Sequence, residues 1–239
     1  MRAIVFGATS AIAQHVLRLW AARGDHFFLV ARSGERLSAV ADDLRVLGAG
    51  SVRTATADLN DLARHPSLFD EAGPFDTVLV AHGLLGDPGR AEDSDPARAE
   101  LILRTNFNSP VSLLTLAAAR VQAGGCLAAL GSVAGDRGRA SNAVYGASKA
   151  GLEAFLSALR QRMFHGGVRV VTIKPGFVDT PMTAHLRKSP LFAAPDKVAR
   201  GIVSAIDRGQ PVVYLPTFWR PIMMIVRAIP EWLFRRLRF

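Results

Sequence analysis

Short apolar runs and helical repeats of apolar residues alternate along the chain. The run Ala3–Phe6 predicts a strand that stops at Gly7. Beyond it, apolar residues between Ile12 and Trp20 recur at the spacing of one helix face, which predicts a helix. The same alternation predicts strands at Phe27–Val30, Val52–Thr56, Thr77–Val80, Cys126–Leu130 and Val168–Ile173, and helices at Glu35–Leu47, Leu62–Phe69, Leu101–Val121 and Ala143–Met163.

This order of elements predicts an α/β fold with a doubly wound parallel sheet. Continuously apolar strands separated by amphipathic helices are typical of a parallel sheet covered on both faces, because each crossover helix packs back over the sheet. We therefore predict one Rossmann-like domain over residues 1–216, with an apolar and basic segment, 217–239, packed on it. The stretch Gly86–Pro96, rich in Asp, Pro and Gly, is predicted to be a surface loop.

Composition narrows the class of protein. In 239 residues, 49% hydrophobic content is enough for a substantial core and excludes disordered and fibrous chains. The single cysteine, Cys126, excludes an intrachain disulfide or a multi-thiolate metal site, and we expect no bound metal. The chain starts in an apolar strand without the layout of a signal peptide, so we expect a cytoplasmic protein.

Basic charge gathers at the end of the chain. The formal net charge is +9, and from Thr217 onward five arginines accompany one acidic residue, Glu231, among many apolar side chains. This mixture suits an anionic membrane surface better than a nucleic acid, and no apolar stretch is long enough to span a bilayer. We expect peripheral contact with the inner membrane face. A lid over the site or an oligomer interface is the alternative for this segment.

The first turn between strand and helix is a candidate phosphate site. Small residues at Gly7, Thr9, Ser10 and Ala11 let backbone N–H groups and the helix N-terminus approach a pyrophosphate, and Ile12 is expected to contact the cofactor as well. The usual fingerprint has three glycines and this turn keeps one, so a plain tight turn is the alternative.

The end of the second predicted strand favours one dinucleotide. An acidic residue there usually binds the ribose of NAD, whereas arginine attracts the 2′-phosphate of NADP. Here Arg32 and Ser33 stand at this place with no acidic residue beside them, so NADP(H) is favoured and NAD(H) stays open. Further cofactor contacts are expected after the third and fourth strands, at Asp58, Leu59, Ala81 and Gly83.

A tyrosine and a lysine four residues apart form the candidate catalytic pair. On a helix, Tyr145 and Lys149 lie on one face with about 6 Å of rise between them. The ammonium and a positively charged oxidised nicotinamide are expected to lower the pKa of the phenol toward values at which it exchanges a proton with a carbonyl or alcohol oxygen. Ser132 ends an apolar strand and can hydrogen-bond the same oxygen. Asn106 could hold a water next to Lys149, or be a helix cap or turn residue.

These residues together resemble the short-chain dehydrogenase/reductase family, in its single-domain branch. The resemblance rests on Gly7, Asp58, Ala81-His82-Gly83, Asn106, Ser132, Tyr145, Lys149, Pro175-Gly176 and Thr180. It implies hydride transfer between a nicotinamide and a ketone or alcohol, with Pro175, Gly176, Val178, Thr180, Tyr145 and Lys149 at the cofactor. It also implies a homodimer or homotetramer that pairs through Leu101–Val121 and Ala143–Met163. Ala11 and Ala13 replace two family glycines, and His82 is either a substrate contact or a structural residue.

Within the family, the chain looks most like reductases of a decaprenylphosphoryl keto-pentose. The similar stretches are Gly83–Asp87, Ala134–Arg137, Met182–Leu186 and the tail from Phe218 to Phe239. The implied substrate is a keto-sugar on a polyprenyl phosphate, with Arg137 and Arg139 binding the phosphodiester or, alternatively, remaining solvated loop charges. A 3-oxoacyl-carrier-protein or other small-ketone reductase, and a non-catalytic dinucleotide sensor or scaffold, are the competing hypotheses.

Overall fold

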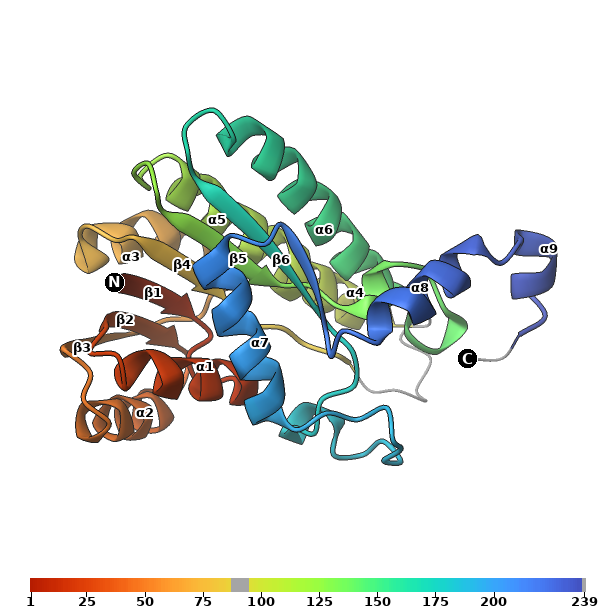
Figure 1. Cartoon of the computed structure of the whole chain (residues 1–239), viewed down its shortest axis with the longest axis horizontal. Coiled ribbons are helices and arrows are strands. Elements are labelled where there is room, and N and C mark those ends of the chain that lie inside the picture. Colours follow the sequence, from red (N-terminus) through yellow and green to blue (C-terminus); the bar gives the residue numbers. More distant parts are fainter. Residues whose placement is uncertain (87–94, 238–239) are drawn as a thin grey trace.

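One parallel sheet lies between two layers of helices (Figure 1). A computed structural model describes residues 1–86 and 95–237. In this part of the chain the strand order is β3-β2-β1-β4-β5-β6-β7 and every pairing is parallel. The strands are β1 (Arg2–Phe6), β2 (His26–Ala31), β3 (Ser51–Thr56), β4 (Thr77–Val80), β5 (Cys126–Leu130), β6 (Arg169–Pro175) and β7 (Val212–Leu215). The helices are α1 (Ala11–Ala21), α2 (Gly34–Val46), α3 (His65–Ala72), α4 (Pro96–Leu103), α5 (Ser109–Ala118), α6 (Ala143–Met163), α7 (Pro195–Arg208), α8 (Trp219–Ala228) and α9 (Glu231–Phe234).

Alternating side chains of each strand enter two separate cores. In β1, Val5 belongs to the core under α1, α2 and α7, and Phe6 to the core under α3, α5 and α6. Burial of both strand faces explains why the strands read as continuous apolar runs rather than as alternating patterns. The predicted fold class, a single Rossmann-like domain, is confirmed. The chain order reverses between β1 and β4, which opens a crevice at the carboxyl ends of the strands.

The helical stretch predicted over about Leu101–Val121 is present, but it begins earlier, at Pro96, ends at Ala118 and is not one regular α-helix. The structure has α4 and α5 joined by a π-helical turn, Arg104–Asn108. Pro110 lies in the first turn of α5 and cannot donate a backbone hydrogen bond, so the regular helical ladder is interrupted at this point.

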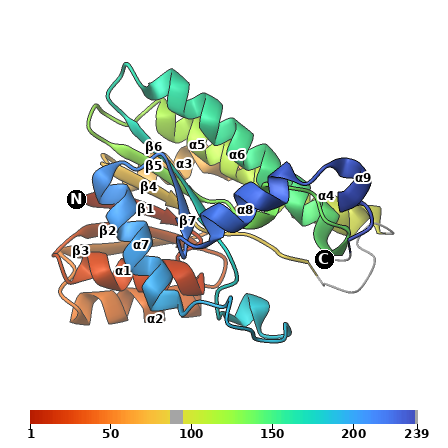
Figure 2. The same cartoon turned by 45° about the vertical axis from the view of Figure 1, so that its right-hand side comes forward.

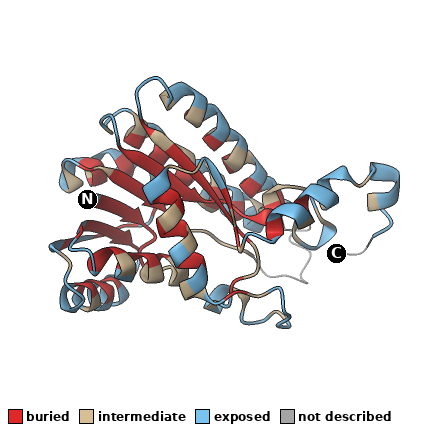
Figure 3. Ribbon diagram, viewed as in Figure 1, coloured by how far each residue is buried: buried red, intermediate tan, exposed pale blue. Residues whose placement is uncertain are grey.

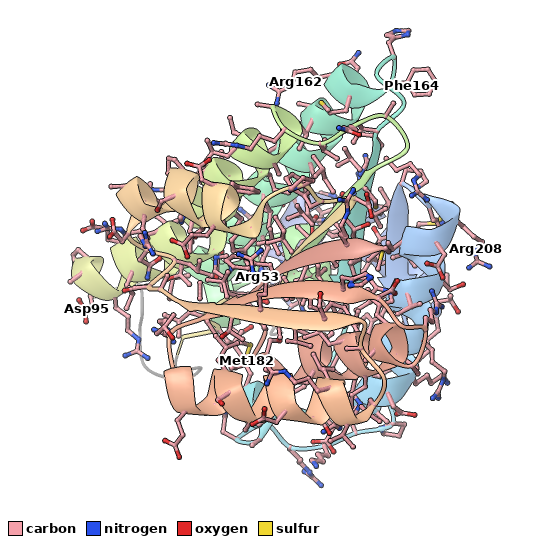
Figure 4. All side chains as sticks on the ribbon, turned by 90° about the vertical axis from the view of Figure 1, so that its left-hand side faces the viewer. Arg53, Asp95, Arg162, Phe164, Met182 and Arg208 are labelled. Atoms are coloured by element: carbon pink, nitrogen blue, oxygen red, sulfur yellow. The ribbon has the colours of Figure 1, made fainter. Side chains whose placement is uncertain are left out.

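The sequence patterns did not predict helix α7 and strand β7. Helix α7 begins at Pro195 and ends at Arg208, and Gly209 follows with a φ of +62°, the left-handed conformation that suits a helix end. Strand β7 then pairs with β6 at the edge of the sheet. Figure 4 views the molecule along the sheet, with Arg208 at the end of α7 and Asp95 before α4 on opposite sides.

The end of the chain projects from the body. Helices α8 and α9 extend to one side next to the end of α4 (Figures 1 and 2), and most of their outer surface is exposed (Figure 3). Among the described residues no helix has both the length and the apolarity needed to cross a membrane. Most of the loop predicted at Gly86–Pro96, residues 87–94, lies outside the described part of the chain, and so do the last two residues, 238–239.

Candidate active site

The crevice at the carboxyl ends of the strands is a cavity of about 850 Å³. Its size is suited to a cofactor together with part of a substrate. The structure brings most of the sequence-predicted site residues to its wall. These are Gly7, Thr9, Ser10, Ala11, Ile12, Arg32, Asp58, Leu59, Ala81, His82, Gly83, Ser132, Arg139, Tyr145, Lys149, Pro175, Gly176, Val178 and Thr180. Ser33, Asn106 and Arg137 do not line it.

The tyrosine and lysine lie on one face of α6, as the spacing predicts. The Lys149 Nζ is 5.9 Å from the centre of the Tyr145 ring and donates a hydrogen bond of 2.8 Å to the Leu130 carbonyl, at the end of β5. Lys149 is buried, and burial lowers its pKa to about 8, although the charge of Glu153 opposes this shift. The hydrogen bond to Leu130 therefore holds the amine next to the phenol, while burial makes its charged form less favourable.

The protein's own groups do not lower the pKa of Tyr145, and the lowering expected with an oxidised nicotinamide bound stays a prediction. Burial raises the pKa of Tyr145 above its ordinary value, and the charge of Glu153 adds to the increase. The Ser132 side-chain hydrogen bond and the Arg139 charge act in the opposite direction without overcoming burial. The phenol is therefore held in its protonated form, which is the form that can donate a proton to a carbonyl oxygen.

Asn106 lies beneath the site, fully buried in the π-helical turn. Its Oδ1 accepts the Leu84 N–H at 2.7 Å, and its Nδ2 donates to the Leu84 carbonyl at 2.8 Å and to Ser148 Oγ at 3.2 Å. The residue is therefore neither a helix cap nor a simple turn residue. It joins the segment after β4 to α6, and its expected role as a water holder stays a prediction.

The first turn has the shape of a phosphate cradle. Gly7 has φ +80°, and a Cβ on it would lie 2.5 Å from the His82 backbone nitrogen, so a side chain is excluded. Helix α1 follows with no acidic residue in its first turn and with no side-chain cap from Ser10, so its first N–H groups are available to an anion. These residues fit a dinucleotide pyrophosphate.

Two orphaned polar atoms support this fit. His82 Nε2 is 3.0 Å from Ser109 Oγ, but His82 Nδ1 and Asn60 Oδ1 are buried in the cavity wall without a partner in the described chain. Burial, followed by the charges of Lys149, His65 and Arg32, lowers the pKa of His82 to about 3, so the ring is neutral. A bound group with hydrogen-bonding atoms would satisfy such positions.

Two arginines stand at the end of β2. Arg32 and Arg36 both line the cavity, and neither forms an ion pair within residues 1–86 and 95–237. Ser33 instead caps α2, where its Oγ accepts the Arg36 N–H at 3.3 Å. Sequence reasoning missed Arg36, although its place one turn after Arg32 was a usable signal.

Arg137 does not contact the cavity, contrary to the expectation that it binds substrate. It donates to the carbonyls of Val226, Arg227 and Ile229 at the end of α8, and it forms a 2.8 Å ion pair with Glu231. Its role is therefore to attach the tail to the body.

One part of the cavity wall is apolar, and its residues were not predicted one by one, although a lid over the site was an alternative for the tail. This part of the wall comes from α8 and from the segment after β6. Trp219 lies directly against Gly176, where no Cβ would fit, and is T-shaped to Phe177. The other apolar wall residues are Met182, Leu186, Leu191, Ile222, Met223 and Val226. The described residues contain no group of three or more His, Cys, Asp or Glu side chains that could hold a metal ion.

Comparison with known proteins agrees with this geometry. A family model described as short chain dehydrogenase matches residues 1–191. The chain belongs to the short-chain dehydrogenase/reductase family. It is an NAD(P)-dependent oxidoreductase, and the fold and reaction implied by the sequence resemblance are confirmed at this level.

Two similar relatives come from bacteria. An uncharacterized oxidoreductase of Mycobacterium tuberculosis strain H37Rv is 41% identical over 240 residues, covering 98% of this chain and 96% of the relative. Another, of Streptomyces coelicolor, is 38% identical over 240 residues, covering 98% and 94%.

Solved structures share the fold. A double mutant of a Serratia marcescens short-chain dehydrogenase/reductase superposes with a TM-score of 0.79 at 20% identity, covering 89% of this chain and 96% of that chain. A Burkholderia cenocepacia dehydrogenase with bound NADP also gives 0.79, at 21% identity, covering 89% and 91%.

Proposed function

We propose that this enzyme is an NADPH-dependent reductase of a ketone carried on an apolar molecule with an anionic group. The polyprenyl-phosphate-linked keto-sugar implied by the sequence is the specific substrate that we propose. The observation that carries the proposal is Arg139, a cation in the cavity wall near Tyr145 with no carboxylate partner in the described residues.

The Arg139 side chain is poorly satisfied by the protein. Its Nη2 donates one long hydrogen bond of 3.4 Å to the Val133 carbonyl, and its Nε is buried without an acceptor. Burial lowers the pKa of Arg139, against the opposing charge of Asp136. Because an incompletely paired guanidinium in a cavity is costly, a phosphate or carboxylate of the substrate would stabilise it.

The rest of the cavity fits the apolar part of such a substrate. Wall residues such as Trp219, Ile222 and Val226 offer no hydrogen-bond partner except the Trp219 indole N–H. A prenyl chain can lie along such a surface, because burying it removes apolar area from water.

The proton chemistry follows from three side chains. Tyr145, kept protonated by burial, would donate its proton to the carbonyl oxygen, and Ser132 would hold that oxygen by a hydrogen bond. The buried Lys149 ammonium would stabilise the phenolate that remains. When bound, the nicotinamide supplies hydride to the carbonyl carbon.

The proposed preference for NADPH rests on Arg32 and Arg36. Two guanidinium groups without ion-pair partners in the described chain can neutralise a 2′-phosphate, which NADH lacks. Gly7 and the start of α1 would hold the pyrophosphate.

We further propose that two copies of the chain pair through α4, α5 and α6.

We also propose that the tail touches an anionic membrane surface. On the tail, Met224 and Ile225 are 65% and 67% exposed and Trp232 is 59% exposed, near Arg235 and Arg236. This arrangement places basic and apolar groups together on one projecting surface. Serine substitutions at Ile225 and Trp232 should reduce cosedimentation with anionic vesicles.

The test of the substrate compares three ketones in an NADPH oxidation assay. They are a prenyl-phosphate-linked keto-sugar, the same keto-sugar without phosphate, and an acetoacetyl thioester. Arg139→Ala should raise KM for the phosphorylated ketone roughly 10- to 100-fold, as expected for a charge-assisted contact, and leave KM for the neutral keto-sugar unchanged.

Arg162→Ala serves as the matched control, because Arg162 is exposed at the far end of α6 (Figure 4). Equal effects of Arg139→Ala on both keto-sugars would overturn the anionic substrate. Preferred turnover of the thioester, unaffected at position 139, would instead identify a carrier-protein reductase.

A further inference from the structure

Glu153 lies on the same face of α6 as the catalytic pair, one turn beyond Lys149. Its Oε1 accepts the Ser132 backbone N–H at 3.0 Å, and its Oε2 forms a 2.7 Å ion pair with Lys174 Nζ. Its side chain is only 10% exposed. A carboxylate thus holds the catalytic serine by its backbone.

The ion pair extends into a buried network. Lys174 Nζ also lies 2.6 Å from Asp136 Oδ1, and Tyr214 donates its hydroxyl to the same oxygen at 3.2 Å. The side chains of Lys174 and Asp136 are 11% and 2% exposed. The network joins α6, β6, β7 and the segment after β5, and Lys174 directly precedes Pro175 and Gly176 in the cavity wall.

The backbone around Glu153 is shaped to admit its carboxylate. A Cβ on Gly131 would lie 2.6 Å from Glu153 Oε1, and a Cβ on Gly135 would lie 2.9 Å from it. Both glycines therefore leave space that the carboxylate occupies, on either side of Ser132. Buried charged networks contribute little net stability compared with apolar packing, so their benefit is better sought in the geometry that they impose.

We propose that Glu153 is a positioning residue of the reaction: it fixes the Ser132 peptide and, through Lys174 and Asp136, the segment that leads to Arg139. Ser132 and Tyr145 are thereby directed at one carbonyl oxygen. The inference goes beyond the proposed function, because it depends on the family's reaction and not on the anionic substrate.

The charge of Glu153 gives this role a distinctive readout. The ionisable and polar groups facing Tyr145 are Lys149 and Glu153 on α6, Ser132 after β5, and Arg139 before α6. Glu153 itself faces Lys174 and Asp136. Its negative charge favours the neutral phenol of Tyr145 and the charged ammonium of Lys149. Removing this charge should make both groups lose their protons at lower pH.

The experiment uses the fact that the chain contains two tyrosines. In a Tyr214→Phe background, ultraviolet titration of tyrosinate absorption reports Tyr145 alone. Glu153→Gln, which keeps an acceptor for the Ser132 N–H, should shift that titration to lower pH. The alkaline limb of kcat for a neutral ketone should move in the same direction.

Measurements of kcat separate the effect of the Glu153 charge from the effect of its hydrogen bond to the Ser132 N–H. We expect Glu153→Gln to lower kcat about 10-fold and Glu153→Leu, which also loses the acceptor, roughly 100-fold, with KM for NADPH unchanged. Glu71→Gln is the matched control, because Glu71 is an exposed carboxylate in a 2.7 Å ion pair with Arg64.

An unchanged Tyr145 titration together with equal kcat in Glu153→Gln and wild type would overturn the proposal. If Glu153→Leu fails to fold, Glu153→Gln alone still decides it. Because the ketone used is neutral, a wrong assignment of Arg139 would leave these results unaffected.

Discussion

The Arg137 guanidinium lies 3.8 Å from the centre of the Phe234 ring, stacked on the last helix of the described chain. Arg139, two residues later, lines the cavity instead. One short segment after Ser132 thus attaches the tail to the body through Arg137 and presents a cation to the substrate space through Arg139.

Arg137→Ala should loosen the tail. The substitution removes hydrogen bonds to the carbonyls at the end of α8 and the ion pair with Glu231. A hydrogen bond from a charged donor stabilises a protein by roughly 1–3 kcal/mol. Proteolytic cleavage within residues 217–237 should accelerate about 10-fold or more, measured under native conditions. An unaltered cleavage rate would show that Arg137 does not anchor the tail. Arg162→Ala is again the control.

Tyr145→Phe should abolish proton transfer and leave cofactor binding intact. We expect kcat to fall roughly 10²- to 10⁴-fold, the range for loss of a general acid. NADPH binding, followed by fluorescence, should remain close to wild type because the ring is retained. Residual turnover near the wild-type rate would exclude Tyr145 as the proton donor.

Replacing both Arg32 and Arg36 by alanine should make the KM values for NADPH and NADH similar. KM for NADPH should rise roughly 10- to 100-fold, since two charge-assisted contacts to a 2′-phosphate are lost, while KM for NADH stays nearly constant. Arg98→Ala, an exposed arginine on α4, controls for the general effect of net charge. A wild-type preference for NADH would contradict the assignment.

His82 predicts a specific loss of stability in acid. Its pKa is lowered to about 3 in the folded protein, so the unfolded chain takes up a proton near pH 6.5 while the folded chain does not. Above about pH 6.5 the neutral ring costs the folded protein no stability. As the pH falls from there toward 3, the free energy of unfolding decreases, and the loss is about 2 kcal/mol at pH 5. Urea unfolding at pH 7 and pH 5 measures this loss.

The His82→Gln variant provides the comparison, because glutamine has no proton to gain in this range. Its stability should change less between pH 7 and pH 5 than that of the wild type. An equal change in both proteins would mean that other groups cause the acid sensitivity.

Local patterns predicted the core of the fold and of the site. The helix Ala143–Met163 has the predicted bounds, because its apolar residues keep one spacing throughout and it carries the Tyr145–Lys149 pair on one face. The turn at Gly7 and the end of β2 at Arg32 were also predictable from a local pattern, because each follows a continuous apolar strand.

Long-range contacts could not be predicted in this way. Nothing around Arg137 indicates that its partners lie on α8 and α9, and nothing around Glu153 distinguishes it from a solvated helix residue until β5 and β6 pack against it. Spacing shows the ammonium beside Tyr145 but not the depth of burial, which raises the pKa of Tyr145 in the protein alone. The missed α7 did have a local signal, with Val198, Ile202 and Ile206 on one face.

The apolar wall built by α8 comes from a part of the chain well after the reacting groups. Proton donor, serine and dinucleotide turn all precede Thr180, whereas Trp219, Ile222, Met223 and Val226 come after the last strand of the sheet. Exchanging α8 between homologous enzymes should therefore change selectivity for the apolar part of a ligand while the chemical step keeps its rate, which makes this helix the natural target for engineering new specificities.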